Sequence, residues 1–157
     1  MPAAVLLTDI VNELEMQFDE QSSFLDLDTG QVETVSRDLL REAEEAEDGD
    51  PEPSLPAWQK EQWEVAKRIV STDRFVPLPR KFDVNDWEIM HDFARSIRSE
   101  KIREDLLDAI HGAGAFRHFK HMLGIHRLEP RWHAFRTEAL RQIAIDWCDE
   151  NDIVWRS

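Results

Sequence analysis

The sequence lacks the features that mark disulfide-bonded, membrane-spanning and secreted proteins. Its single cysteine, Cys148, excludes an internal disulfide. It has no hydrophobic run of about 18 residues, so we expect no membrane span. The short apolar run at residues 3–7 has no cation before it and is followed by Asp9, Glu13 and Glu15, which does not fit a secretion signal. We therefore expect a cytoplasmic protein.

Recognisable catalytic and metal-binding motifs are also missing. The chain contains no His-Glu-Xaa-Xaa-His motif and no Gly-Lys-Ser/Thr ending of a phosphate-binding P-loop. His118 and His121 have the i, i+3 spacing of a chelating pair, but a metal site needs further ligands and supporting hydrogen bonds. We expect no metal and no cofactor. No Ser-His-Asp, Cys-His or paired-carboxylate arrangement follows from the spacing, so the sequence identifies no catalytic residue.

Charge is distributed unevenly along the chain. The net charge of −14 arises from residues 1–56, which hold 16 acids and 2 bases, whereas residues 57–157 hold 17 of each. Residues 112–141 contain six bases and two acids. An acidic chain argues against general nucleic-acid binding, whose affinity comes mostly from phosphate neutralisation, but it leaves room for a local anion site.

The acidic run from Glu42 to Asp50 has several interpretations. It is most often a solvated helix face and loop. It could also mimic nucleic acid or occupy a basic partner, or fold over the cationic residues in the C-terminal part of the same chain. The sequence leaves these alternatives open.

The length of 157 residues fits a single domain that needs no disulfide or metal. We divide it into an acidic helix–hairpin–helix part at residues 1–47, a proline-rich loop at 48–56 and a helical part at 57–157. The predicted class is α+β with helix dominant. We expect an N-terminal helix and β-hairpin, then a C-terminal multi-helix bundle with a core rich in Trp and Phe.

Apolar residues at three- and four-residue spacing predict the helices. Asp28-Thr29-Gly30 between two apolar segments predicts a hairpin turn. Ser36 and Ser99 are expected to be N-caps, and Pro130 suits the first turn of the last helix. Prolines at residues 75–79 suit an extended segment at a sheet edge. The predicted helices span residues 5–18, 36–47, 57–70, 84–98, 99–111, 116–123 and 130–150.

The segment Gly112-Ala113-Gly114-Ala115-Phe116-Arg117-His118-Phe119-Lys120 combines glycines, aromatic rings and cations. A Gly-Xaa-Gly sequence before a helix could cradle a phosphate, because exposed N–H groups and the helix dipole attract anions. The interpretation that we favour is structural. Gly112 ends one helix, and Gly114 permits close packing at the start of the next.

Aromatic residues follow helical spacing in two places near the C-terminus. Phe116, Phe119 and Leu123 form one set, and Trp132, Phe135 and Ala139 form the other. Stacking on nucleic-acid bases is one use of such rings, but this spacing is more typical of two helices that pack together. We expect that packing to leave Arg117, Lys120 and Arg136 near one another at its rim.

The glycine-rich segment and Trp132-His133-Ala134-Phe135-Arg136 carry a family resemblance. The chain resembles Uncharacterised Protein Family zero-one-five-eight, a group of bacterial proteins of unknown function. Its members show a Gly-Xaa-Gly-Ala-Phe-Arg-Xaa-Phe-Lys block, then Trp-Xaa-Xaa-Phe-Arg, then a helix ending in Trp, here Trp147. Leu25-Asp26-Leu27-Asp28-Thr29-Gly30 and the segment from Met90 to Phe93 fit as well. The resemblance covers most of the chain and implies no activity, so no functional residue is carried over.

We expect a soluble binding or regulatory protein with a local cationic surface that contacts an anionic small molecule or a protein. One alternative is an enzyme acting on a phosphorylated substrate near Gly112–Lys120, with His118 or His121 and Arg117. Another is a structural oligomer subunit held together by its Trp-rich helices. The candidate ligand- or partner-binding residues are Gly114, Arg117, Lys120, His121, Arg131 and Arg136.

Overall fold

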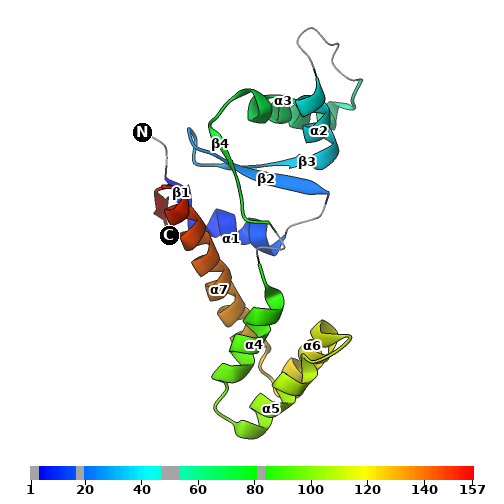
Figure 1. The fold of residues 1–157 in the computed structure, drawn as a ribbon, viewed down its shortest axis with the longest axis vertical. Coiled ribbons are helices and arrows are strands. Elements are labelled where there is room, and N and C mark those ends of the chain that lie inside the picture. Colours follow the sequence, from blue (N-terminus) through cyan, green and yellow to red (C-terminus); the bar gives the residue numbers. More distant parts are fainter. Residues whose placement is uncertain (1–3, 17–19, 47–53, 81–83) are drawn as a thin grey trace. The chain divides into compact units, whose positions relative to one another are not determined.

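The computed structural model of the protein describes residues 4–16, 20–46, 54–80 and 84–157. Helices dominate it, and the strands are short (Figure 1). The predicted α+β class with dominant helix is therefore confirmed. The elements in chain order are β1 (Val5–Leu6), α1 (Leu7–Glu15), β2 (Gln21–Asp26), β3 (Val32–Ser36), α2 (Arg37–Glu45), α3 (Ala57–Ser71), β4 (Phe75–Pro77), α4 (Asp86–Ser96), α5 (Glu100–Ala109), α6 (Ala115–Ile125), α7 (Glu129–Glu150) and β5 (Trp155–Arg156).

The chain forms two compact units. Unit 1 contains residues 1–81 and 144–157, and unit 2 contains residues 82–143. Helix α7 contributes to both, because its last two turns belong to unit 1. The division into 1–47, 48–56 and 57–157 within one domain stays a prediction, and most of the loop at 48–56 lies outside the described residues.

Unit 1 is built on the predicted hairpin, which is confirmed. Strands β2 and β3 pair in antiparallel register, with Ser23 opposite Thr34. The turn between them places Gly30 at a φ of 71°, a conformation that a residue without a Cβ adopts at little cost. Strand β4 pairs with the other side of β2, so the predicted edge position of the proline-containing segment is also correct.

Helices cover both faces of this three-stranded sheet (Figure 1). On one face, the Glu13 carboxylate of α1 accepts hydrogen bonds from the Ser23 hydroxyl at 2.9 Å and the Thr34 hydroxyl at 3.3 Å. On the other face, α2 and α3 share a core of Leu39, Ala43, Trp63 and Ala66. Because successive side chains of β2 and β3 point to opposite faces of the sheet, these strands contribute side chains to both faces.

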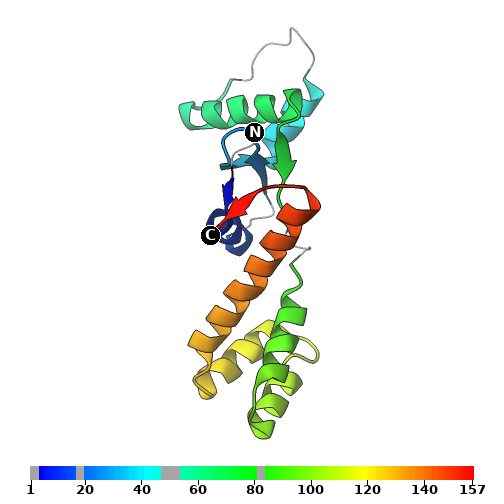
Figure 2. The same ribbon diagram turned by 90° about the vertical axis from the view of Figure 1, so that its left-hand side faces the viewer.

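The first helix begins two residues later than predicted. Val5 and Leu6 form strand β1, which runs parallel to β5 (Figure 2). The Val5 N–H donates to the carbonyl of Val154 at 3.0 Å. Helical spacing could not show this pairing because its partner lies at the opposite end of the sequence. Phe18, the last residue of the predicted helix, lies outside the described residues.

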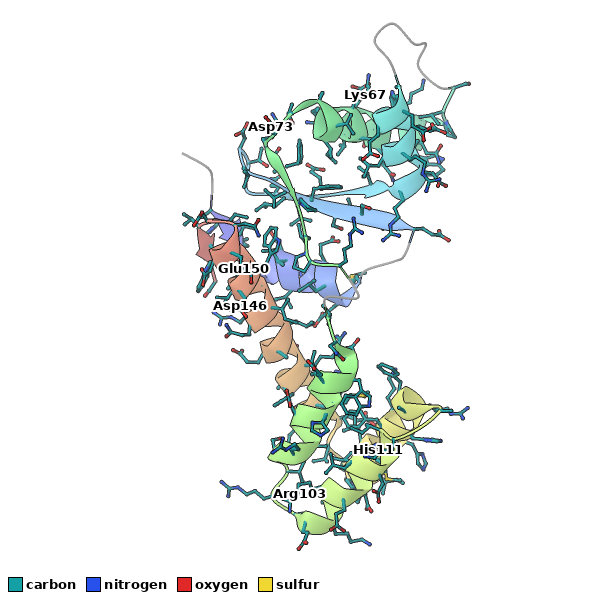
Figure 3. All side chains as sticks on the ribbon, viewed as in Figure 1. Lys67, Asp73, Arg103, His111, Asp146 and Glu150 are labelled. Carbon is teal, nitrogen blue, oxygen red and sulfur yellow. The ribbon has the colours of Figure 1, made fainter. Side chains whose placement is uncertain are left out.

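Unit 2 consists of α4, α5, α6 and the first part of α7. The Asn85 side chain caps α4 by accepting from the Glu88 N–H, and the Ser99 hydroxyl caps α5 by accepting from Ile102 as predicted. Between these helices, Arg103 (labelled in Figure 3) donates from Nη1 to the carbonyl of Ile97 at 3.0 Å. None of the helices in the four described ranges is long and apolar enough to cross a membrane.

Helix α6 extends beyond residue 123, where the predicted helix ends before Gly124. It passes through Gly124 and ends at Ile125, and the left-handed residue that follows is Arg127, with a φ of 56°. The Leu128 N–H then donates to the carbonyl of Leu123 at 2.9 Å. This hydrogen bond and the burial of Leu128 close the helix end without a glycine.

Candidate functional site

The glycine-rich segment links α5 to α6 inside unit 2. Gly112 and Gly114 have φ values of 89° and 76°. Gly114 is the N-cap of α6, and its carbonyl accepts from the His118 N–H at 3.0 Å. A Cβ at Gly114 would stand 3.7 Å from Arg117 Nη2 and 3.6 Å from His118 Cε1. The side chains of the first turn of α6 therefore lie close to its glycine cap.

A cluster of aromatic rings holds α4, α6 and α7 together. The ring of Phe93 in α4 meets Trp132, Phe135 and Phe119 edge to face, at centroid distances of 5.4, 5.3 and 6.3 Å. Phe119 and Trp132 also contact each other at 4.9 Å. These distances suit attraction between the edge of one ring and the face of another. The expected packing of aromatic residues between α6 and α7 exists, and Phe93 of α4 lies at its centre.

Phe116 does not join this cluster, contrary to expectation. Its side chain is 53% exposed, whereas Phe119 is 1% exposed. Phe116 lies in the first turn of α6, where helical spacing alone does not show whether a partner helix extends far enough to cover it. The exposed ring of Phe116 instead borders a pocket.

This pocket has a volume of about 330 Å³ and lies beside the aromatic cluster. Buried Met90, Phe119 and Trp132 form its floor. The remaining lining residues are Phe116 and Lys120 from α6, His133 and Arg136 from α7, and Asp86 from α4. We call this the unit 2 pocket.

Helical geometry places the rim residues in pairs. Phe116 and Lys120 are four residues apart on α6, and His133 and Arg136 are three apart on α7. Residues at these spacings project from the same face of a helix. The rim thus combines an aromatic ring, two cations and an imidazole above an apolar floor.

Arg136 is held by Asp86. Its Nε lies 3.1 Å from Asp86 Oδ1, and both side chains are about one quarter exposed. Asp86 belongs to the first turn of α4, where a negative charge also interacts favourably with the helix dipole. The remaining Arg136 N–H groups and the Lys120 ammonium have no protein acceptor within the described ranges. They are available to an anion.

The other candidate residues lie elsewhere. His121 lines a second pocket of about 300 Å³ with His118, Asp105 and Asp108, between α5 and α6. Within the described part of the chain, no three His, Cys, Asp or Glu side chains are arranged to hold a metal ion. Gly114, Arg117 and Arg131 are exposed and line neither pocket. Among the six candidates, the structure brings only Lys120 and Arg136 into one pocket.

Three residues of the pocket rim, Asp86, His133 and Phe116, are not among the candidates from the sequence. His133 precedes Arg136 by three residues, so helical spacing could have identified it. Asp86 lies 50 residues before Arg136, and no local pattern relates the two. The spacing of Phe116 from Phe119 predicts a core position, but this spacing does not take into account that Phe116 lies in the first turn of α6.

Comparison with known proteins identifies the family. The model of the uncharacterised protein family UPF0158 matches residues 2–156. The chain belongs to this family. The UPF0158 protein PA5073 of Pseudomonas aeruginosa is 27% identical over 150 residues, covering 94% of this chain and 85% of that protein. No solved structure matches the chain. The resemblance drawn from the Gly112 and Trp132 blocks is confirmed, and residues from both blocks line the unit 2 pocket.

Proposed function

We propose that this UPF0158 protein is a binding protein whose unit 2 pocket holds an apolar side chain of a protein partner with carboxylates beside it. The observation that carries this proposal is the lining of the pocket. Cations from two helices, Lys120 and Arg136, border a floor made of Met90, Phe119 and Trp132.

The floor selects for an apolar group. Its three residues are at most 8% exposed and are already fixed by packing, so an apolar side chain entering the pocket gains burial with little reordering of the protein. The contacts of Phe119 and Trp132 with Phe93 fix the shape of the floor. This rigidity supports a preformed binding site.

The rim selects for negative charge. Counting Lys120, Arg136 and Asp86, it has a net charge of +1. Because Asp86 engages the Nε of Arg136, the guanidinium is oriented before a ligand arrives. A guanidinium with free N–H groups can bind a carboxylate through two parallel hydrogen bonds.

A protein partner suits the pocket better than a nucleic acid or a small molecule. The chain carries a net charge of −14, which opposes a polyanion such as nucleic acid. Small-molecule sites bury most of their ligand's surface, whereas Lys120, His133 and Phe116 leave this pocket open at the rim. An exposed aromatic ring and a partly exposed arginine beside a buried floor are typical of protein interfaces.

A labelled synthetic peptide tests the proposal. The probe is a fluorescein-tagged pentapeptide, Asp-Glu-Trp-Glu-Asp, compared with the same peptide carrying Ala in place of Trp and with a Lys-Lys-Trp-Lys-Lys peptide. Fluorescence anisotropy should show saturable binding of the acidic Trp peptide only. Lys120→Glu should weaken that binding at least about tenfold, since it reverses a rim charge.

Arg117→Glu is the matched control. It makes the same change of charge on the same helix, but Arg117 does not line the pocket. Equal loss of binding in both variants would mean that general attraction, and not the pocket, holds the peptide. Binding of the Ala peptide as tightly as the Trp peptide would refute the role of the apolar floor.

A further inference from the structure

The unit 2 pocket brings an apolar surface and two cations into one small space. Its volume of about 330 Å³ lies at the lower end of the range of ligand sites, which is about 300–1,000 Å³. Met90, Phe119 and Trp132 form the floor, and Lys120 and Arg136 border the same space. A ligand that uses both surfaces must therefore carry its apolar group and its negative charge close together.

The guanidinium of Arg136 is prepared for a single carboxylate. Its Nε donates to Asp86 Oδ1 at 3.1 Å, and its two terminal Nη groups have no acceptor in the described ranges. These two groups can donate parallel hydrogen bonds to the two oxygens of one carboxylate. The ammonium of Lys120, which is exposed, adds a second positive charge to the same pocket. The cations thus suit one carboxylate that lies close to the floor.

Asp86 adds a hydrogen-bond acceptor to the lining. Its Oδ1 accepts from Arg136, whereas its Oδ2 accepts no hydrogen bond from the residues that the structure describes. A carboxylate in this position favours a donor and repels further negative charge. The lining therefore requires three groups in a ligand, which are a large apolar side chain, one carboxylate and one hydrogen-bond donor.

We infer that the ligand of the unit 2 pocket is the C-terminal residue of a partner protein, with a large apolar side chain. This inference rests on the proposed function and names the part of the partner that binds. A C-terminal residue carries all three groups on one Cα atom. Its side chain contacts the floor, its carboxylate binds Arg136 and Lys120, and its amide N–H donates to Asp86. An internal residue lacks the carboxylate, so the charge must come from a neighbouring side chain that lies several bonds farther away.

A C-terminus also fits the open rim of the pocket and the charge of the chain. The preceding residues of the partner leave the pocket past the exposed side chains of Phe116, Lys120 and His133. The net charge of −14 opposes a partner that is itself strongly acidic. A C-terminus supplies one carboxylate beside an apolar side chain whatever the net charge of its protein, and capture of terminal carboxylates is a recurring mode of peptide recognition.

Peptides that differ only at the C-terminus test the inference. The probe is fluorescein-tagged Gly-Ser-Gly-Ser-Trp with a free carboxyl group, and its binding to the full chain is measured by fluorescence anisotropy. The first control is the same peptide with a C-terminal amide. The second is the isomer Gly-Ser-Trp-Gly-Ser, which has the same charge but carries it away from the ring. The probe should bind at least about tenfold more tightly than either control, because only the probe places a charged acceptor beside the apolar side chain.

Lys120→Met isolates the contribution of the rim charge. It removes the ammonium of an exposed side chain but keeps an unbranched apolar stem, so the fold of unit 2 should persist. It should reduce the preference for the free acid over the amide at least about threefold and leave the affinity for the amide unchanged. Arg117→Met is the matched control, because it makes the same change on the same helix outside the pocket and should keep the full preference.

The inference and the proposed function fail in different ways. Equal affinities for the probe, its amide and its isomer would refute recognition of a C-terminus, while binding of the acidic Trp peptide would still support the pocket. If none of the Trp peptides binds, both proposals are refuted. A preference for the free acid that Lys120→Met leaves unchanged, or that Arg117→Met also removes, would overturn the assignment of the carboxylate to this rim. Tighter competition by free tryptophan than by the unlabelled probe would assign the pocket to a small molecule and would contradict a protein partner.

Discussion

Phe93 is the residue on which the candidate site depends most. Its ring is 2% exposed and lies against Phe119, Trp132 and Phe135. Phe119 and Trp132 form part of the pocket floor. We predict that Phe93→Leu and Phe93→Ala destabilise unit 2 by different amounts, because they remove different parts of this arrangement.

The magnitudes follow from the contacts. Leu keeps much of the buried apolar surface but removes three edge-to-face ring contacts, each worth about 0.5–1.5 kcal/mol beyond burial. These values are not additive, so we expect Phe93→Leu to cost about 2 kcal/mol. Ala removes the burial as well and leaves a cavity among the rings, which raises the expected cost to about 3–5 kcal/mol.

The measurement must report on unit 2 alone, because two units need not unfold together. Hydrogen exchange measured peptide by peptide over residues 115–125 provides the free energy of opening of α6. Phe116→Leu is the matched control, and its exposed ring should make it nearly neutral. The acidic Trp peptide should also bind more weakly to both Phe93 variants, since the floor loses its support.

Two results would refute this reasoning. If Phe93→Leu lies within about 0.5 kcal/mol of the wild type, the edge-to-face contacts contribute little to stability. If Leu and Ala destabilise α6 equally, burial at this position does not matter. A variant that loses stability but binds the peptide normally would show that binding at the pocket floor does not depend on the ring cluster.

Three further predictions concern other parts of the chain. Asp26 is 3% exposed, and its carboxylate pairs with Arg74 at 3.3 Å. Arg74→Met leaves this buried carboxylate without its cation and should destabilise unit 1 by about 2 kcal/mol in urea unfolding. Asp26→Asn added to Arg74→Met should recover part of that loss, and strictly additive costs would contradict the pairing. Burial raises the pKa of the Cys148 thiol to about 11 from its ordinary value of 9.0, with a smaller contribution from Asp149, so Ellman's reagent should label the thiol only after unfolding. The pKa of Cys148 is higher in the folded than in the unfolded protein, so raising the pH ionises the unfolded chain first. The contribution of the neutral thiol to stability is therefore complete below pH 9 and is lost as pH rises through about 11. In this range the free energy of unfolding of the wild type should fall more steeply than that of Cys148→Ala. Gly114→Ala should cost about 1 kcal/mol through its φ of 76° alone, since the new Cβ meets only ordinary contacts; an unchanged melting temperature would contradict this.

Local patterns predicted most of the helices and the hairpin. Helical spacing located α3, α4, α5 and α7 to within a few residues, and Asp28-Thr29-Gly30 located the turn between β2 and β3. These features depend on interactions between residues close in sequence, such as side-chain caps and the positive φ of Gly30. Such interactions can be read from the order of the residues.

Other features depend on pairs of residues that are far apart in the chain. The parallel pairing of β1 with β5 joins residues 5–6 to 155–156, and the Asp86–Arg136 ion pair joins α4 to α7. Neither partner predicts the other, because the distance between them is set by how the intervening helices pack. The end of α6 at Ile125 also depended on the burial of Leu128, and not on Gly124.

The candidate site shows the same division. The sequence by itself determined the family, the acidic charge of residues 1–56, the cationic charge of residues 112–141 and the aromatic spacing of α6 and α7. Only the tertiary structure decided that Lys120 and Arg136 share a pocket, that Arg117, Arg131 and His121 lie outside it, and that Phe116 is exposed. The physical reason is that charge and periodicity belong to single segments, whereas a pocket exists only where the side chains of several packed helices leave space between them.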